Sequence, residues 1–372
     1  MSPVSLGVPC AIPSPAKASR VGWVDIAKGW CIVMVVTMHS TLGVGEDLDA
    51  TSWLHAFVAF AKPFRMPDFF LIAGLMAGGA LTMPWRRFLD RKVLHFAYFY
   101  ALWLAIVLVV KSGALGLTDP AQFVRAYLWS LVEPFSTLWF IQLLPLFYLA
   151  LRLAERVGRT SALAVALALH GLAAAHPAGG AYAMTSAWTG WTTLDSFALF
   201  FIYFYVGHIA RGALFRLAEA AARRPALSLS GLLAWGAAQA LAVREGLTEL
   251  PGIALIAGFS GALAVVAAAS LLSRLRLARP LAYFGRNSLA IYLSFVLPMA
   301  AMRILLLKTG AFCDVGLIAV IVSGFAIVTP LGMRAAFART PLAFLFTRPD
   351  WACLDQGPGG RNQAVASASI AR

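Results

Sequence analysis

Three ionisable residues lie inside the first long apolar stretch of the sequence, WVDIAKGWCIVMVVTMHS, where charged groups are costly and often functional. In a helix, Lys28 and His39 would fall within about 20° of the same face and about 16 Å apart along the axis. Asp25, one turn before Lys28, is placed to pair with it. Because an imidazole titrates near neutral pH, this face is a candidate site for general-base chemistry. The structural alternative is a histidine that is only packed and hydrogen-bonded.

A second cluster, Lys62, Arg65 and Asp68, lies beside two prolines in AKPFRMPDFFLIAGL. Pro63 and Pro67 remove backbone donors and predict a broken helix. Broken helices persist at membrane depth only where protein or a water-filled cavity satisfies the freed backbone groups. Two interpretations follow: an Arg65–Asp68 ion pair that only stabilises the bend, or a cationic pocket that binds an anionic or carbonyl group.

A third polar group opens a late apolar run, in YFGRNSLAIYLS. Arg286 fits an inner membrane boundary, and Asn287 is of a residue type that caps helices, so this group has a structural and a functional interpretation. The other histidines have no aligned charged partner and are expected to be structural: His55, His95, His170, His176 and His208. The four cysteines lack the spacing of a zinc site or a disulfide framework, so no metal is implied.

The composition shows what class of protein must position these residues. Of the 372 residues, 60% are hydrophobic and 12% are charged, about half the charged share of a soluble domain. These values exclude a soluble enzyme and a disordered protein, and they predict an all-α polytopic protein in a lipid bilayer. The net charge of +14 comes from short basic clusters between apolar runs. That is the positive-inside pattern, so nucleic acid is not an expected partner.

Ten apolar runs are long enough to cross a bilayer, which takes about 17–25 residues each. They are 24–44, 52–82, 93–111, 136–154, 160–176, 195–211, 226–243, 251–272, 281–305 and 314–334. If the N-terminus is cytoplasmic and each run crosses once, the outer segments hold few basic residues: Lys111, Arg125, Arg244 and Lys308. The positive-inside rule therefore predicts ten spans with both termini in the cytoplasm. Residues 1–22 are expected to be a flexible tail, 23–348 the membrane domain and 349–372 a disordered tail.

The second run is too long for one straight crossing, since about 30 residues in a helix extend about 45 Å. Its two prolines divide it. We expect an interfacial or re-entrant piece at 52–62, a break, and a spanning piece at 67–82.

These residues resemble the integral-membrane acyltransferase-3 family, bacterial enzymes that O-acylate sugars and surface polymers. Lys28 through His39 is similar to the family's first helix, in which a basic residue is followed by ten residues and a histidine. FRMPDFFLIAGL resembles the family's hMPLFFFLSG segment, and the family's RxxR pair corresponds to Lys62 and Arg65. LWFIQLLPLF, FFIYFYVGH and YFGRNSLAIYL also resemble family landmarks. The sequence departs from the family pattern in two respects: Lys28 and Lys62 replace arginines, and Ser294 stands where many members have a histidine.

The resemblance implies a bacterial inner-membrane enzyme that transfers an acyl group, expected to be acetyl, from cytoplasmic acyl-CoA to a hydroxyl of a glycan or lipid-linked sugar. No permanently bound cofactor is expected. His39 would be the general base, and Lys28, Lys62 and Arg65 would bind the donor or its oxyanion. Asp25, Asp68, Arg286 and Asn287 would support them. The sequence leaves open whether an acyl-histidine forms. The alternative class is a transporter that uses the intramembrane charges as a substrate or proton pathway.

Overall fold

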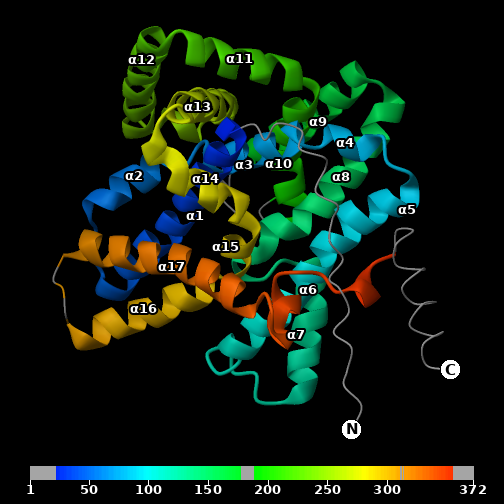
Figure 1. The fold of residues 1–372 in the computed structure, drawn as a ribbon, viewed down its shortest axis with the longest axis vertical. Coiled ribbons are helices and arrows are strands. Elements are labelled where there is room, and N and C mark those ends of the chain that lie inside the picture. Colours follow the sequence, from blue (N-terminus) through cyan, green and yellow to red (C-terminus); the bar gives the residue numbers. More distant parts are fainter. Residues whose placement is uncertain (1–21, 177–187, 311, 313, 355–372) are drawn as a thin grey trace.

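A computed structural model describes residues 22–176, 188–310, 312 and 314–354, and within these ranges the chain is helical without a strand (Figure 1). The predicted all-α class is therefore confirmed. The expected N-terminal tail lies outside the described residues except for Gly22, which begins the first helix.

Each of the ten predicted apolar runs contains helix. In chain order these are α1 (Gly22–Leu48); α2 (Trp53–Ala61), α3 (Arg65–Leu75) and α4 (Gly78–Leu81); α6 (His95–Lys111); α8 (Trp139–Val157); α9 (Arg159–Ala174); α10 (Thr192–Ile209); α12 (Pro225–Arg244); α13 (Pro251–Leu272); α14 (Arg279–Arg286), α15 (Ser288–Ser294) and α16 (Val296–Thr309); and α17 (Val315–Phe337). The connections hold α5 (Trp85–Phe88), the π-helix η1 (Leu89–Leu94), α7 (Pro120–Val132), η2 (Ser136–Leu138), α11 (Arg211–Arg223), η3 (Leu247–Glu249), η4 (Arg276–Ala278), η5 (Pro341–Leu345) and η6 (Asp350–Ala352).

By length and apolarity, seven helical stretches of the described chain qualify as membrane spans, or up to eight if α15 and α16, bent by 55°, form one span. The predicted count of ten is larger because it includes α9, which has 16 residues, and the broken pair α2 and α3, with 9 and 11. The number ten and the cytoplasmic position of both termini stay predictions.

The second apolar run is broken, as predicted. Helix α2 ends at Ala61 and α3 begins at Arg65, so Pro63 lies in the break. Pro67 lies in the first turn of α3, where a missing backbone N–H removes no helical hydrogen bond. The second piece is shorter than the expected 67–82, because α3 stops at Leu75 and Gly78–Leu81 form the separate helix α4.

Two glycine pairs let the helices of the site approach one another closely. A Cβ added at Gly29 of α1 would collide with the carbonyl of Leu281 on α14, and one at Gly285 with the carbonyl of Asp25. Helices α3 and α10 meet in the same way, at Gly74 and Gly207. Small residues permit such backbone contacts inside a membrane, so these crossings fix α1 and α3, which carry the predicted site.

Contacts between helix ends agree with the predicted alternation of sides. At the predicted outer end of α1, Asp47 pairs with Arg303 of α16 at 3.0 Å. At its predicted inner end, Asp25 lies 3.9 Å from Arg286 of α14. Asp90, in a connection predicted to be on the inner side, lies 2.7 Å from Arg348, which also belongs to a predicted inner segment.

The chain after α17 is ordered further than expected. Arg348 and the Asp90 carboxylate are both buried, and the same carboxylate accepts the backbone N–H of Leu354 at 2.7 Å. Arg86 donates to the carbonyl of Leu354 at 2.8 Å. Residues 349–354 therefore pack onto η1 rather than belonging to a disordered tail, and the rest of the expected tail lies outside the described residues.

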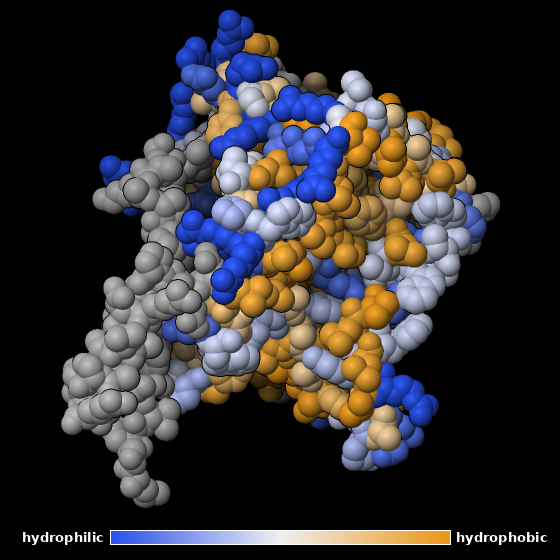
Figure 2. Space-filling view, turned by 90° about the vertical axis from the view of Figure 1, so that its right-hand side faces the viewer, coloured by the Kyte–Doolittle hydropathy of each residue, from blue (hydrophilic) through white to orange (hydrophobic). Residues whose placement is uncertain are grey.

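Large apolar side chains cover much of the surface, as a bilayer requires. Figure 2 shows them spread across one face, with hydrophilic side chains gathered mainly toward its upper end. Helix α12 is the extreme case, since Gln239 is its one buried residue while Leu233 is 67% exposed. These surfaces are consistent with a protein surrounded by lipid.

Candidate active site

A cavity of about 450 Å³ lies among α1, α2, the start of α3, η2 with the start of α8, α10 and α15. It brings together three of the predicted site residues, His39, Lys62 and Arg65. The complete lining is Val35, Met38, His39, Leu42, His55, Val58, Ala59, Lys62, Arg65, Met66, Thr137, Trp139, Phe200 and Tyr292. Lys28, Asp25, Asp68, Arg286 and Asn287 do not line it.

His39 is held by packing. Its imidazole lies 5.6 Å from the ring of Phe295, and in the described chain it makes no direct hydrogen bond to protein. Arg65 and Lys111 are close enough to act on it electrostatically. His39 therefore lines a cavity with the hydrogen-bonding capacity of its ring nitrogens unused by the described residues, as a base that must meet a substrate requires.

Arg65 lines the same cavity, and part of its guanidinium has no hydrogen-bond partner in the described chain. Its Nε and one Nη are buried without a hydrogen-bond partner in the described chain. Asp68, three residues later, forms no ion pair with it there. The carboxylate of Asp68 is fully buried, and its neighbours include the thiol of Cys31. The interpretation of Arg65 and Asp68 as a simple bend-stabilising ion pair is therefore not supported.

Lys62 has a direct partner from the far part of the chain. Its Nζ lies 2.7 Å from Oε1 of Glu249, the last residue of η3 between α12 and α13. The two side chains are 45% and 47% exposed. Lys62 thus lies at the edge of the cavity, against a segment predicted to be on the outer side.

Lys28 lies apart from the cavity, and the expected Asp25–Lys28 pair is wrong. Asp25 instead forms its ion pair with Arg286, because the Gly29–Gly285 crossing brings α14 against the start of α1. Lys28 is half-buried and still feels the charge of Asp25.

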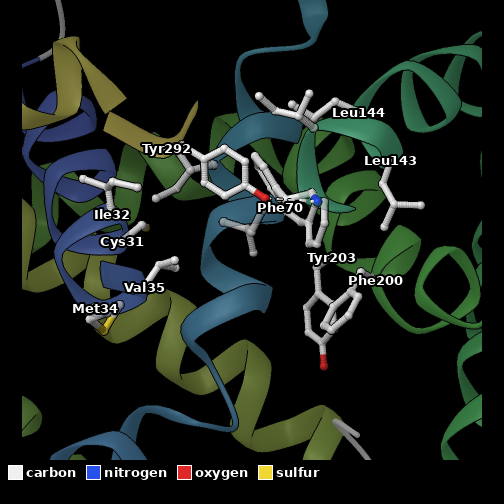
Figure 3. Packing of buried hydrophobic residues seen from close by; sticks show 14 of the residues in the cluster. Cys31, Ile32, Met34, Val35, Phe70, Leu143, Leu144, Phe200, Tyr203 and Tyr292 are labelled. Atoms are coloured by element: carbon white, nitrogen blue, oxygen red, sulfur yellow. Dashed lines mark hydrogen bonds between the residues drawn. The ribbon is translucent and has the colours of Figure 1, made fainter. Parts of the chain in front are cut away.

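The face of α1 between Lys28 and His39 is packed. Cys31 and Ile32 are fully buried and Val35 is 3% exposed. Figure 3 shows these side chains directed toward α3 and α15, where Phe70 and Tyr292 fill the space. A donor arm that ran along this face, as the spacing suggested, would have to displace them.

Asn287 serves as a connector between helices. Its side-chain oxygen accepts a hydrogen bond from Arg334 of α17, and its amide donates to the carbonyl of Tyr283 at 2.8 Å. Arg286 pairs with Asp25 of α1 at 3.9 Å. The third polar cluster therefore joins α14, α17 and α1 at one end of the bundle, and it supports the cavity only through those helices.

Two cavity residues, Thr137 and Tyr292, have roles that the sequence analysis missed. The Tyr292 hydroxyl donates to the carbonyl of Thr137 and accepts the backbone N–H of Phe140 at 3.2 Å. Thr137 lines the cavity, and its hydroxyl is buried without a partner in the described chain. Tyr292 could have been found from the sequence, because it lies in the segment YFGRNSLAIYL that resembles a family landmark. Nothing in the sequence singles out Thr137.

His55, expected to be structural, does line the cavity. Its Nδ1 accepts the backbone N–H of Ser52 at 3.0 Å, in a capping box that starts α2. The capping contact agrees with a structural role, but a substitution of His55 would also alter the cavity lining. His170 lies outside the cavity, with Nδ1 2.8 Å from the carbonyl oxygen of Leu199.

The comparisons with known proteins identify the family of this chain. The family model described as an acyltransferase domain, that of the acyltransferase-3 family, matches residues 21–335. The inner membrane protein YcfT of Escherichia coli (strain K12) is 30% identical over 91 residues, which are 22% of this chain and 25% of that protein. The match thus spans about a quarter of that relative's length. No solved structure matches the chain significantly. Since the family match covers every helix that lines the cavity, the chain belongs to the acyltransferase-3 family of membrane proteins.

Proposed function

We propose that the protein is a membrane O-acyltransferase that moves an acyl group, expected to be acetyl, from cytoplasmic acyl-CoA to a hydroxyl of a glycan or lipid-linked sugar. The observation that carries the proposal is the shared cavity, which is lined both by His39, an imidazole with no hydrogen bond to the described chain, and by Arg65, whose guanidinium has two nitrogens without a partner there. This combination supplies a base and a fixed positive charge in a largely apolar enclosure, which acyl transfer requires.

In the proposed reaction His39 takes the proton of the acceptor hydroxyl, and the oxygen attacks the thioester carbonyl. The carbonyl oxygen becomes negatively charged, and the free N–H groups of Arg65 stabilise it. Collapse of the tetrahedral intermediate breaks the carbon–sulfur bond. The thiolate of CoA leaves and takes the proton from the imidazolium. The sequence leaves open a two-step alternative, in which the acyl group is first transferred to His39 and then from His39 to the acceptor hydroxyl.

For the donor, Lys28 is the proposed contact of the CoA phosphates, about 16 Å from His39 along α1. The packed residues Cys31, Ile32 and Val35 separate the two, so donor binding must shift α1 relative to α3. Lys62 was expected to share the donor role, but its contact with Glu249 favours a different one, developed below. We place the enzyme in the bacterial inner membrane, which is also where the name of the E. coli relative puts that protein.

The test is acceptor-dependent CoA release by the purified protein in vesicles. Acyltransfer predicts thiol release that requires both acetyl-CoA and an acceptor, together with an acylated product detected by mass spectrometry. A transporter would instead show substrate counterflow without thiol release, and that result would refute the proposal.

A further inference from the structure

The ion pair between Lys62 and Glu249 joins the cavity to a distant turn. Lys62 lines the cavity beside Arg65, whereas Glu249 ends the three-residue helix η3, 187 positions along the chain. Their charged atoms are 2.7 Å apart, and both side chains are close to half exposed. A carboxylate of the protein therefore occupies the open side of a cavity-lining ammonium group.

The cavity itself carries only positive formal charge. Among the described residues, its charged lining residues are Lys62 and Arg65, and none of the lining residues is Asp or Glu. Arg65 has unpaired N–H groups, and Asp68 does not pair with it in the described chain. Glu249 compensates Lys62 only from the open side, and Asp68 acts on Arg65 without a hydrogen bond to it, so an anionic group inside the cavity would still meet unpaired guanidinium N–H groups.

The contact with Glu249 is weak enough for a ligand to replace it. Exposed ion pairs contribute about 0.2–1 kcal/mol, because solvent screens them and both side chains lose freedom. An anion that also filled the cavity would displace Glu249 at little cost. The side chain of Glu249 can then swing into solvent, since η3 is a short turn between α12 and α13.

The position of Lys62 indicates which substrate it meets. Helix η3 connects two helices at the predicted outer side, whereas Lys28, the proposed donor contact, lies near the inner end of α1. An anion that reaches Lys62 from the side of η3 thus belongs to the acceptor.

We propose that Lys62 binds a carboxylate or phosphate group of the acceptor, and that Glu249 occupies this position in the free enzyme. The inference rests on the proposed acyltransfer and narrows its acceptor to an anionic sugar, such as a uronic acid or a glycosyl phosphate. The anion fixes the sugar at the cavity edge, and a neighbouring hydroxyl reaches His39.

The test compares sugars that differ in charge, with acetyl-CoA as the donor. The probes are 4-nitrophenyl β-D-glucuronide, α-D-glucose 1-phosphate and 4-nitrophenyl β-D-xyloside, which lacks the charged group. We expect one or both anionic sugars to have a higher kcat/KM than the uncharged xyloside. The comparison of the glucuronide with the glucose phosphate shows whether a carboxylate or a phosphate is preferred. Glu249→Gln should lower KM for the preferred anionic sugar by up to about fivefold, the equivalent of about 1 kcal/mol. Its KM for the xyloside should not change.

Lys62→Met should abolish the preference for the anionic sugar while KM for acetyl-CoA stays constant. Glu245→Gln is the matched control, because Glu245 is an exposed acid of the same turn that pairs with Arg244 at 3.5 Å rather than with the cavity. This variant should behave as wild type. Equal use of charged and uncharged sugars, or a preference that survives Lys62→Met, would overturn the inference.

A binding measurement separates this inference from the proposed reaction. The glucuronide or the glucose phosphate should raise the melting temperature of the purified wild-type protein more than that of Lys62→Met, in the absence of acetyl-CoA. Such stabilisation without any CoA release would support the anion site and refute acyl transfer. Equal melting shifts in both proteins would refute the anion site even where CoA release is observed.

Discussion

The hydroxyl of Tyr292 on α15 bridges two backbone groups at the start of α8, the carbonyl of Thr137 and the N–H of Phe140. Tyr292 is 4% exposed and forms one wall of the cavity, and its ring meets that of Phe140 at a centroid distance of 5.5 Å. This single side chain therefore fixes the position of η2, and with it Thr137 and Trp139, relative to His39.

The first prediction concerns this bridge. Tyr292→Phe keeps the ring but leaves two buried backbone groups without a partner, at a cost of about 1–3 kcal/mol each. We expect a lower melting temperature and a reduced kcat, with less effect on KM for acetyl-CoA. A thermal melt and steady-state kinetics on the same preparation measure both. An unchanged melting temperature would show that the bridge does not stabilise the fold.

The second prediction concerns the unpaired guanidinium of Arg65. If it stabilises the thioester oxyanion, Arg65→Met should lower kcat by about 10²–10³, the loss found when one oxyanion donor is removed. Arg65→Lys keeps the charge but loses the planar set of donors, so it should restore only part of the rate. Single-turnover acyl transfer at saturating acetyl-CoA gives the comparison. A large rise in KM for acetyl-CoA at constant kcat would instead assign Arg65 to donor binding.

Hydrophobic run length was enough to predict the helices of the ten apolar runs, because a stretch that faces lipid must be apolar throughout, but it did not predict α7 and α11 in the connections. Pro63 likewise predicted the break after α2. His39, Lys62 and Arg65 were predicted as site residues, and the structure places them in one cavity. These residues could be predicted because the signal is local. The helix break beside Lys62 leaves backbone polar groups unpaired, and at membrane depth such groups persist only where protein or a cavity accommodates them.

What the sequence could not predict depends on helix crossings. Asp25 was paired with Lys28 because sequence shows only neighbours on one helix, whereas the contact of Gly29 with α14 brings in Arg286. The same limitation hid the partner of Lys62, since Glu249 meets it only when the fold brings η3 beside the break after α2. Tyr292 gains its role from contacts with α8 that no periodicity reveals.

The third prediction tests the membrane topology. Ala114 and Ala220 are both exposed, in connections predicted to be on the outer and inner sides respectively. In intact cells, Ala114→Cys should react with an impermeant thiol reagent, and Ala220→Cys should react only after permeabilisation. The unsubstituted protein gives the background from its own cysteines. The reverse labelling pattern would contradict the assignment of the termini to the cytoplasm.

The fourth prediction is that His39 is the catalytic base. Loss of general-base catalysis costs about 10²–10⁴ in rate, whereas loss of a packing histidine acts through stability. His39 touches Phe295 by its ring and makes no hydrogen bond to the described chain, so His39→Gln should leave expression and melting temperature near wild type. Gln keeps a polar side chain of similar reach but cannot take the proton, and product formation should therefore collapse.

The matched control for His39 is His170→Gln, a buried histidine outside the cavity whose hydrogen bond to Leu199 holds α9 against α10. This variant should lose stability before it loses specific activity, the opposite order from His39→Gln. The deciding measurement is the rate of acetyl transfer divided by the amount of folded protein, which is determined from the size-exclusion profile. If His39→Gln keeps more than about a tenth of wild-type turnover, a smaller loss than base removal causes, the histidine only packs against Phe295 and another group must accept the proton.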